Sequence, residues 1–388
     1  MKHCFMSKIK KKIKVGVIFG GQSGEHEVSI VSAQSVMSAL AKNRRYEVIP
    51  IGITKDGRWI AGRQALSLLK AGANKLPFKF ILPPDPTEKR LVRVEEKSLK
   101  PARGKIQFQE LDVIFPVLHG TLGEDGAIQG MLELANIPYV GSGVLGSAVG
   151  MDKIIQKQLF KQAGLPIVDY VWFLTKLWQK NQPVVIKQIE TALTYPVFTK
   201  PANSGSSVGI GKCHNRRELI LGLKDASLYD RKILVEQGID SIQEIEVAVL
   251  GNDLPQASVP GEIIASNEFY DYDAKYVDGK SRAIIPAKLP VQASQAIRQT
   301  ALAAFKTLDL AGLARVDFFV KKGSFKIYLN EVNTIPGFTT ISMYPKLWQA
   351  SGLSYAKLLD RLIQLALTRQ KEKNKLSTSY QPKADWYR

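Results

Sequence analysis

The sequence predicts a protein of several α/β units, the first of them built on an open parallel sheet. Two stretches indicate this, residues 14–40 and 112–134, because each has an apolar strand, a glycine turn and then helical spacing. A third stretch, residues 315–333, has two apolar runs around a Lys-Lys-Gly-Ser turn, which is typical of a hairpin. With 388 residues and 45% hydrophobic composition, the chain is long enough for two or three domains.

The net charge of the chain and its distribution indicate what kind of partner the protein binds. The net charge of +19, from 54 basic and 35 acidic residues, is compatible with a nucleic-acid-binding protein. Much of the excess lies at the two ends, where charge runs are usually solvated, and no nucleic-acid-binding motif accompanies it. We therefore expect an anionic small molecule as partner and no nucleic acid.

The apolar runs and the cysteines point to a cytoplasmic setting. No run approaches the ~20 residues of a membrane span, so we expect no membrane partner. The two cysteines give neither a disulfide framework nor metal-ligand spacing.

The first unit is predicted over residues 13–142, after a basic extension at residues 1–12. Its predicted elements are strands at 14–19, 47–53 and 112–118, helices from 29 to 40 and up to 134, and a variable connection at 62–108. Glycine turns after parallel strands place ligands at the carboxyl ends of those strands. Glu25 follows one such turn and either complements a helix dipole or holds a substrate ammonium. His119 lies at the other and is either a packed histidine or a ligand for a substrate carboxylate.

The second unit is predicted over residues 143–236. Its predicted elements are a helix capped at 151–153 and running to 163, strands at 168–173, 197–200, 208–212 and 232–236, and helices at 183–191 and 216–225. The Ser/Gly stretch 203–209 can lay backbone N–H groups around phosphate oxygens, although it lacks the P-loop spacing and could be a plain turn. Lys200 precedes this stretch and could meet the same phosphates. Glu236 ends a strand, where it could face an adenine edge or the solvent.

The third unit is predicted over residues 237–369, with a disordered tail at 370–388. Its predicted elements are strands at 244–250 and 256–265, a helix at 293–308, the hairpin, and a helix at 351–368. The Tyr-rich loop 267–285 is too polar for a core strand and fits a lid that excludes water, or an ordinary surface loop.

The hairpin carries the strongest functional signal. Asp317, Glu331 and Asn333 offer only oxygen ligands, which Mg²⁺ accepts. Arg315 lies two residues before the first carboxylate, so the period of a strand places both on one face. A cation site beside an arginine suggests phosphate chemistry. The alternative is a surface salt-bridge ladder, but acidic residues inside apolar runs are unfavourable unless they are used.

Six motifs in order resemble those of the D-alanine–D-alanine ligases, members of the ATP-grasp family. They are Gly-Gly-Gln-Ser-Gly-Glu-His-Glu-Val-Ser, His-Gly-Thr-Leu-Gly-Glu-Asp-Gly, Met-Asp-Lys, Lys-Pro-Ala-Asn-Ser-Gly-Ser-Ser-Val-Gly, Tyr-Asp-Tyr-Asp-Ala-Lys-Tyr and Asn-Glu-Val-Asn-Thr-Ile-Pro-Gly-Phe-Thr. The resemblance covers Val15 to about Leu365 and implies a three-domain ATP-grasp architecture, α/β of the mixed α+β kind. It also implies a homodimer that joins two D-alanines through a D-alanyl phosphate, releasing ADP and phosphate, for peptidoglycan precursor synthesis.

The same resemblance implies roles for individual residues. ATP would be bound by Lys153, Lys200, Ser206, Ser207, Glu236, Gln237, Ile239, Glu244, Lys275 and Asn330. Asp317, Glu331 and Asn333 would ligate two Mg²⁺ ions, for which Mn²⁺ could substitute. The substrates would be bound by Glu25, His119, Arg315, Gly337 and Ser342, and the catalytic set would be Glu25, Ser206, Tyr276, Arg315 and Gly337.

The acceptor of the reaction has alternatives within the family. Relatives that make D-alanyl-D-lactate lack the lid tyrosine at the position of Tyr276, so its presence here favours D-alanine as acceptor. A D-alanyl-D-lactate or D-alanyl-D-serine ligase is the alternative, and a basic nucleic-acid-binding protein is a remote one.

Overall fold

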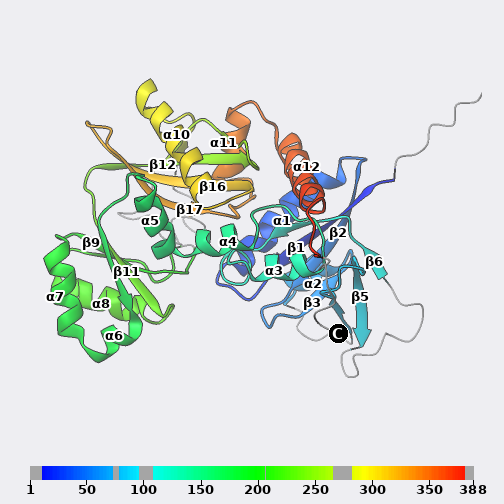
Figure 1. Ribbon diagram of the computed structural model, residues 1–388, viewed down its shortest axis with the longest axis horizontal. Coiled ribbons are helices and arrows are strands. Elements are labelled where there is room, and N and C mark those ends of the chain that lie inside the picture. The colour runs from blue at the N-terminus through cyan, green and yellow to red at the C-terminus, as the bar shows by residue number, and fades with distance from the viewer. Residues whose placement is uncertain (1–10, 73–77, 96–107, 206, 265–281, 381–388) are drawn as a thin grey trace, which may run out of the picture.

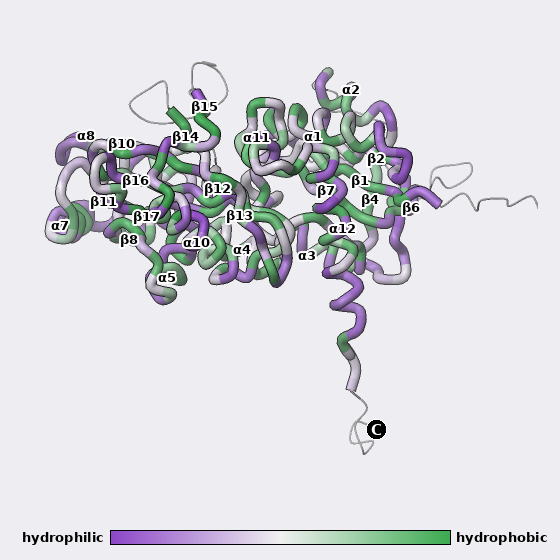
Figure 2. The backbone as a smooth tube through the Cα atoms, turned by 90° about the horizontal axis from the view of Figure 1, so that it is seen from above, coloured by the Kyte–Doolittle hydropathy of each residue, from purple (hydrophilic) through white to green (hydrophobic). Residues whose placement is uncertain are grey.

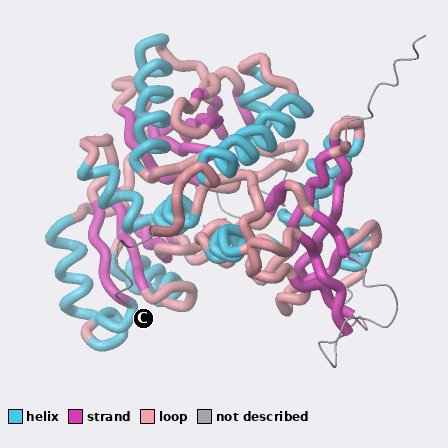
Figure 3. Tube along the Cα trace, turned by 45° about the vertical axis from the view of Figure 1, so that its right-hand side comes forward, coloured by secondary structure: helices cyan, strands magenta, loops and turns pink. Residues whose placement is uncertain are grey.

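Three main sheets and one small sheet organise the chain (Figure 1). The computed structural model describes residues 11–72, 78–95, 108–205, 207–264 and 282–380. In Figure 3 the strands form separate groups, with loops between them facing the middle of the molecule. The mixed α/β class predicted from the sequence is confirmed. None of the helices in these ranges is long and apolar enough to cross a membrane.

The first sheet has the order β3-β2-β1-β7; β2, β1 and β7 form the predicted parallel part, and β3 is antiparallel to β2. Its elements are β1 (Ile13–Gly20), α1 (His26–Ala41), β2 (Tyr46–Ile53), β3 (Trp59–Ala61), α2 (Ala65–Lys70), β7 (Val113–Val117) and α3 (Ala127–Leu134). β1 pairs in parallel with β2 and β7, so the turns that follow β1 and β7 leave the same edge. The prediction of a variable connection at 62–108 is wrong in part. Besides α2, it contains β4 (Phe78–Ile81) and β5 (Arg90–Glu95), which form an antiparallel sheet with β6 (Phe108–Glu110).

The second sheet has the order β10-β9-β11-β8 and a core of its own. Its elements are β8 (Tyr170–Leu174), α6 (Thr175–Lys180), α7 (Gln182–Ala192), β9 (Val197–Pro201), β10 (Gly211–Cys213), α8 (Arg216–Ala226) and β11 (Lys232–Gln237). Two helices precede it, α4 (Val144–Met151), which was not predicted, and α5 (Lys153–Gln162). Asp152 caps α5 as predicted, because its carboxylate accepts hydrogen bonds from the N–H groups of Ile154 and Ile155.

The third sheet is antiparallel and runs β15-β14-β12-β16-β17, with β13 beside β12. Its elements are β12 (Ile242–Gly251), β13 (Gln256–Ala257), β14 (Gly261–Ile264), β15 (Arg282–Ile284), α10 (Val291–Thr307), β16 (Gly312–Lys321), β17 (Ile327–Asn333), α11 (Met343–Ala350) and α12 (Tyr355–Lys373). The predicted hairpin is confirmed as the β16–β17 pair.

The end of the chain corrects the prediction of a disordered tail from residue 370. α12 continues to Lys373, and its last turns are hydrophilic in Figure 2. Polar contacts with the first unit hold them. Arg369 donates to the carbonyl oxygens of Tyr139 (3.3 Å) and Gly141, and Lys373 forms an ion pair with Glu133.

The first and third units share one hydrophobic core. Phe19 and Ala33 of the first unit belong to the same buried cluster as Leu347, Leu358 and Leu362 of the third. In Figure 1, α12 lies beside the first unit and away from α6, α7 and α8 of the second. These two units are therefore packed as one body, and the second sheet, which has its own core, lies on the other side of the site.

Candidate functional site

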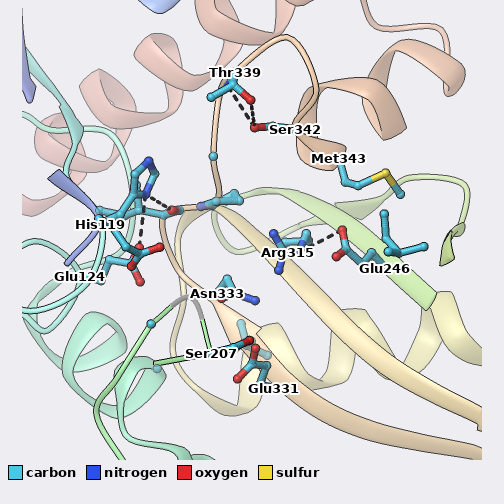
Figure 4. Close-up of a pocket in the computed structure, with 18 of the residues that line it drawn as sticks. His119, Glu124, Ser207, Glu246, Arg315, Glu331, Asn333, Thr339, Ser342 and Met343 are labelled. Carbon is cyan, nitrogen blue, oxygen red and sulfur yellow. Dashed lines mark hydrogen bonds and ion pairs between the residues drawn. The ribbon is translucent and has the colours of Figure 1, made fainter. Parts of the chain in front are cut away.

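A cavity of about 250 Å³ lies where the three units meet (Figure 4). The turns after β1 and β7 contribute Glu25 and His119, α5 contributes Lys153, and the third sheet contributes Arg315 and Glu331. The cavity therefore gathers residues that the sequence assigned to three different parts of the chain.

Three carboxylates form a row at the cavity, and the two at its ends line it. The register pairs Glu246 on β12 with Asp317 on β16, and Asp317 with Glu331 on β17. Directly opposed residues share a face of the sheet, and neighbouring strands lie ~4.8 Å apart, so the row spans roughly 10 Å. We call Glu246, Asp317 and Glu331 the carboxylate row. Two residues before Asp317 on the same strand, Arg315 is paired with Ala248 on β12 and with Asn333 on β17.

Arg315 is fixed by the carboxylate row. Its Nε and Nη2 donate to the two oxygens of Asp317 at 2.8 and 2.7 Å, and Nε lies 3.1 Å from Oε2 of Glu246. Burial lowers the pKa of Arg315, but Asp317 and Glu246 outweigh it and hold that pKa well above its usual value. The prediction that Arg315 and Asp317 share a face is confirmed, and the guanidinium is a permanent, oriented cation.

The three predicted metal ligands lie together. Asn333 donates its side-chain N–H to Oδ2 of Asp317 at 2.9 Å, and Lys153 Nζ lies 3.6 Å from Oε2 of Glu331. Within the described ranges no three His, Cys, Asp or Glu side chains are arranged to hold a metal. The predicted ligands Asp317, Glu331 and Asn333 are a different kind of set, with two carboxylates and one amide. All its donors are hard oxygens, which fits a cation that completes its shell with phosphate oxygens and water.

A sealed cluster of charge lies beside the cavity, which we call the lysine cluster: Lys157, Lys200 and Glu236. The two Nζ atoms lie 2.7 and 2.6 Å from the two oxygens of Glu236, and every member is at most 6% exposed. Burial would raise the pKa of Glu236, but the lysines outweigh it and bring that pKa to about 2. Burial lowers the pKa of Lys157, whereas Glu236 and Glu331 raise that of Lys200 despite its burial.

The lysine cluster changes the expected picture of the nucleotide site. Lys200 and Glu236, predicted to face phosphates and adenine, face each other, and both lysines reach Asn330, through Oδ1 for Lys200 and the backbone oxygen for Lys157 (each 3.3 Å). Lys157 was missed by the sequence reasoning. Lys157 follows Lys153 by four residues, so both lie on one face of the helix, and this spacing could have indicated a second lysine near the site.

The other predicted nucleotide residues surround this cluster. Gln237 turns its amide away, exchanging hydrogen bonds with the backbone of Thr194 (2.9 and 2.7 Å). Glu244 precedes Glu246 by two residues on β12, and its charge contributes to the raised pKa of Lys200. Ile239 lies half-buried in the loop between β11 and β12.

The Ser/Gly stretch lies against the opposite wall. Ser204 accepts a hydrogen bond from Lys153 Nζ through its backbone oxygen at 2.7 Å. A Cβ on Gly205 would lie 2.3 Å from Oε2 of Glu25, so a larger residue there would displace the Glu25 carboxylate. Ser207 has a left-handed backbone with φ of 61° and lines the cavity. Ser206, Lys275 and Tyr276 lie outside the described residues, as does most of the predicted lid.

His119 is buried against a carboxylate that the sequence reasoning missed, Glu124. Its Nδ1 lies 3.5 Å from Oε1 of Glu124 and 3.0 Å from the backbone oxygen of Ile335. Burial raises the pKa of Glu124, and it would lower that of His119, but Glu124 and Glu25 outweigh it and raise the histidine's pKa. Within the described chain, Nε2 has no hydrogen-bond partner. The signal for Glu124 was its place on the same glycine turn, five residues after the histidine.

The far end of the cavity is a tight turn before α11. Ser342 Oγ accepts from the N–H of Thr339 at 3.0 Å and lies 2.8 Å from its Oγ1 (Figure 4). A Cβ on Gly337 would lie 2.8 Å from this Oγ, so the turn needs glycine there. Gly337 and Ser342 both line the cavity, as expected for one substrate end.

The chain matches known families over most of its length. The family model described as D-ala D-ala ligase N-terminus matches residues 14–142, and the one described as D-ala D-ala ligase C-terminus matches residues 159–364. It is 50% identical to a D-alanine–D-alanine ligase of Natranaerobius thermophilus, over 95% of this chain and 99% of that protein. A counterpart in Heliobacterium modesticaldum is 49% identical, over 96% and 99%.

Solved structures of D-alanine ligases are also similar to this chain. A D-alanine–D-alanine ligase from Coxiella burnetii has a TM-score of 0.75 and 36% identity, covering 94% of this chain and 96% of that one. The VanG D-Ala:D-Ser ligase from Enterococcus faecalis has a TM-score of 0.79 and 36% identity, covering 92% and 100%.

Proposed function

The chain belongs to the D-alanine–D-alanine ligase family, and on that premise we propose that its central cavity is where it joins two D-alanines. It is an ATP-dependent enzyme with the mixed α/β fold of the ATP-grasp ligases. The product is D-alanyl-D-alanine, for peptidoglycan precursor synthesis, with release of ADP and phosphate. The observation that carries the proposal is Arg315, which is held by carboxylates between a phosphate-binding end and a turn suited to an amino acid.

The phosphate-binding end activates the first substrate. A carboxylate is a poor electrophile, so the γ-phosphoryl group of ATP must first be transferred to it, and this needs cations against the crowded charge. Lys153 reaches the cavity from α5, and Ser204, Gly205 and Ser207 of the Ser/Gly stretch line it and are assigned to hold phosphate through backbone N–H groups. Ser206 is assigned with them on the family resemblance alone. The lysine cluster adds a net positive charge beside it. We assign the adenosine part of ATP to the region of Glu236, Gln237, Ile239 and Glu244.

The metal ligands are assigned to Asp317, Glu331 and Asn333, holding two Mg²⁺ ions. When bound, the cations neutralise charge on the transferring phosphoryl group. Arg315 occupies both oxygens of Asp317 in this structure, and Glu331 lies close to Lys153. The chain's own contribution is to keep these oxygens on one rigid hairpin, beside the lysine that meets the same phosphates.

The first D-alanine is assigned to Glu25 and His119. Glu25 would take its ammonium, and His119, whose raised pKa favours the charged form, would lie near its carboxylate. Glu124 fixes the histidine ring through the contact at Nδ1. The proposed site for the first D-alanine is thus built on the turns after β1 and β7, which leave the same edge of the first sheet.

The second D-alanine is assigned to the turn at Gly337 and Ser342. Its amine would attack the acyl phosphate, and Arg315 with the Gly337 N–H would stabilise the tetrahedral oxyanion, a role worth ~3–4 kcal/mol per donor in comparable sites. Lys275 and Tyr276 are assigned to a lid that keeps water from the acyl phosphate, on the family resemblance alone.

The proposal also covers the location, the oligomeric state and the partners of the enzyme. We place the enzyme in the cytoplasm as a homodimer with small-molecule partners and no nucleic acid or membrane partner. Sedimentation equilibrium tests the dimer, and a monomer at micromolar concentration would contradict it.

The activity test is release of ADP and phosphate that depends on both D-alanine and Mg²⁺. Release independent of D-alanine would contradict the proposal. Because one similar structure is named a D-Ala:D-Ser ligase, the products should be identified by mass spectrometry with D-alanine, D-serine and D-lactate present together. D-alanyl-D-alanine is expected to dominate, and a dominant D-alanyl-D-serine or D-alanyl-D-lactate would support the alternative acceptor.

A further inference from the structure

The segment assigned to the second D-alanine contains no helix or strand of its own. It covers residues 335–342, all within the described chain, and we call it the acceptor turn. It presents Gly337 and Ser342 to the cavity, and Figure 4 shows Ser342 next to Thr339 at that end. Because regular backbone hydrogen bonds do not fix this segment, its shape depends on side chains that bind its backbone from outside.

Phe338 anchors the acceptor turn in the shared core of the first and third units. It directly follows Gly337 and is 1% exposed. Its ring lies edge-on to that of Phe115 of β7, with the ring centroids 5.6 Å apart. It also packs against Tyr344 of α11 and Tyr355 of α12, at 5.7 and 6.4 Å between centroids. These aromatic contacts hold the ring, and with it the backbone beside Gly337, in one place.

Two side chains bind the backbone of Phe338, one on each side of its Cα. Its N–H donates to Oγ of Ser32 on α1 at 3.3 Å, and its carbonyl oxygen accepts from the hydroxyl of Tyr355 at 3.2 Å. That carbonyl belongs to the same peptide group as the N–H of Thr339, which donates to Ser342 Oγ at 3.0 Å. One peptide group therefore connects the hydroxyl of Tyr355 to that of Ser342. Hydrogen bonds at both ends of an amide polarise it and strengthen each other.

Tyr355 and Ser32 hold the acceptor turn without lining the cavity. Neither is among the described residues around it, so neither is expected to touch a substrate. Both lie on helices that pack into the shared core, α1 and α12. The turn is therefore held in place from the core of the protein, on the side away from the substrates.

We propose that Tyr355, together with Ser32, positions the acceptor turn and thereby sets how strictly the enzyme selects its acceptor. The inference rests on the proposed function and adds positioning residues to it. D-serine differs from D-alanine by one hydroxyl group, which a binding site rejects through a close fit around the methyl group. A turn that is held less firmly leaves more room there, so discrimination between the two acceptors should fall.

Tyr355→Phe tests this, because phenylalanine keeps the ring that packs on Phe338 and removes only the hydroxyl. With D-alanine and D-serine present together, the ratio of D-alanyl-D-alanine to D-alanyl-D-serine is expected to fall by about three- to tenfold, the loss of one hydrogen bond. This ratio reports how one acyl phosphate divides between two acceptors, so it does not depend on the fraction of folded enzyme. The KM for ATP should stay the same. Tandem mass spectrometry, which reads the order of the two residues, gives the ratio.

Tyr344→Phe is the matched control. Tyr344 packs on the same ring of Phe338, but its hydroxyl donates to the backbone oxygen of Val249 on β12 at 3.0 Å, not to the acceptor turn. Tyr344 is fully buried and Tyr355 half-buried, so the control should lower the stability of the fold at least as much. It is expected to leave the product ratio at the wild-type value. An equal change of the ratio in both variants would overturn the proposal.

Ser32→Ala tests the other side of Phe338. It removes the oxygen that accepts from the Phe338 N–H and is expected to lower the product ratio in the same direction as Tyr355→Phe. An unchanged ratio in Ser32→Ala would remove Ser32 from the positioning residues.

The outcomes distinguish this inference from the proposed function. If the wild-type protein forms no dipeptide, the proposed function fails. If it forms dipeptide, and Tyr355→Phe lowers the rate but keeps the wild-type product ratio, Tyr355 only stabilises the fold and the inference alone is overturned.

Discussion

The lysine cluster and the carboxylate row are both charged, but they differ in sign and in access to the cavity. The lysine cluster has two cations around one anion, so a positive charge remains, and its members are sealed from solvent. The carboxylate row has three anions against Arg315 and Lys153, so one negative charge remains, and its two end members line the cavity. The first group therefore leaves positive charge beside the proposed phosphate site, and the second leaves negative charge for the proposed metal ions.

Removing the anion of the sealed cluster should have the largest effect on stability. Glu236→Gln leaves two buried ammonium groups without a counter-charge and is expected to lower the free energy of unfolding by about 3–5 kcal/mol. Urea unfolding at pH 7 measures this. Glu331→Gln is the matched change in the carboxylate row, where the side chain is 23% exposed, and about 1 kcal/mol or less is expected. Equal losses would contradict the distinction between the two groups.

Removing the cation of the carboxylate row should affect the reaction more than the fold. Arg315→Met is expected to lower kcat by about 10²–10³-fold, because the guanidinium acts on charge that develops during the reaction. The KM for ATP should change little. Steady-state kinetics provides both values, and a parallel loss of ATP affinity would place Arg315 in the nucleotide site instead.

Acid should weaken the sealed cluster in a defined pH window. The pKa of Glu236 is about 2 in the fold and near 4.3 in the unfolded chain, so its contribution is complete above pH 4.3 and is lost as the pH falls towards 2. For this one proton the slope reaches about 1.4 kcal/mol per pH unit within that window. The free energy of unfolding of Glu236→Gln, measured between pH 5 and 2.5, should fall less steeply than that of the wild type. Parallel slopes would rule out this assignment.

The smallest expected effect is on the metal requirement. Glu331→Gln should raise the Mg²⁺ concentration for half-maximal activity by about tenfold, since even supporting groups change metal affinity by that amount. Glu246→Gln, the same change at the other end of the carboxylate row, should leave the Mg²⁺ requirement as it is. A metal titration of both variants decides this, and an unchanged curve for Glu331→Gln would remove Glu331 from the ligands.

The sequence predicted local geometry well and partnerships poorly. The alternation of a strand sufficed to place Arg315 and Asp317 on one face, and hydrophobic spacing sufficed for the hairpin. Glu246 and Lys157 were not found, because their roles depend on which strands and helices become neighbours. Strand order is a property of the whole fold, and β12 joins β16 across a stretch of about sixty residues.

The sequence reasoning also missed the pairing of charged residues with one another. Lys200 and Glu236 were both assigned to ATP from the resemblance, and the pattern around each gave no sign that they would bind one another. The tail prediction failed for a similar reason, since the helix that ends at Lys373 is held by contacts with Tyr139, Gly141 and Glu133 far along the chain.

The core shared by the first and third units also constrains how the protein can be made. β1 and α1 leave the ribosome long before α12, but the cluster that buries Phe19 and Ala33 includes Leu358 and Leu362 of α12. At translation rates of ~5–20 residues per second, α12 emerges on the order of tens of seconds after the first unit. During that interval the apolar face of the first unit lacks its cover. A nascent chain stalled before α12 would therefore present this face to chaperones, although its first sheet is already complete in sequence.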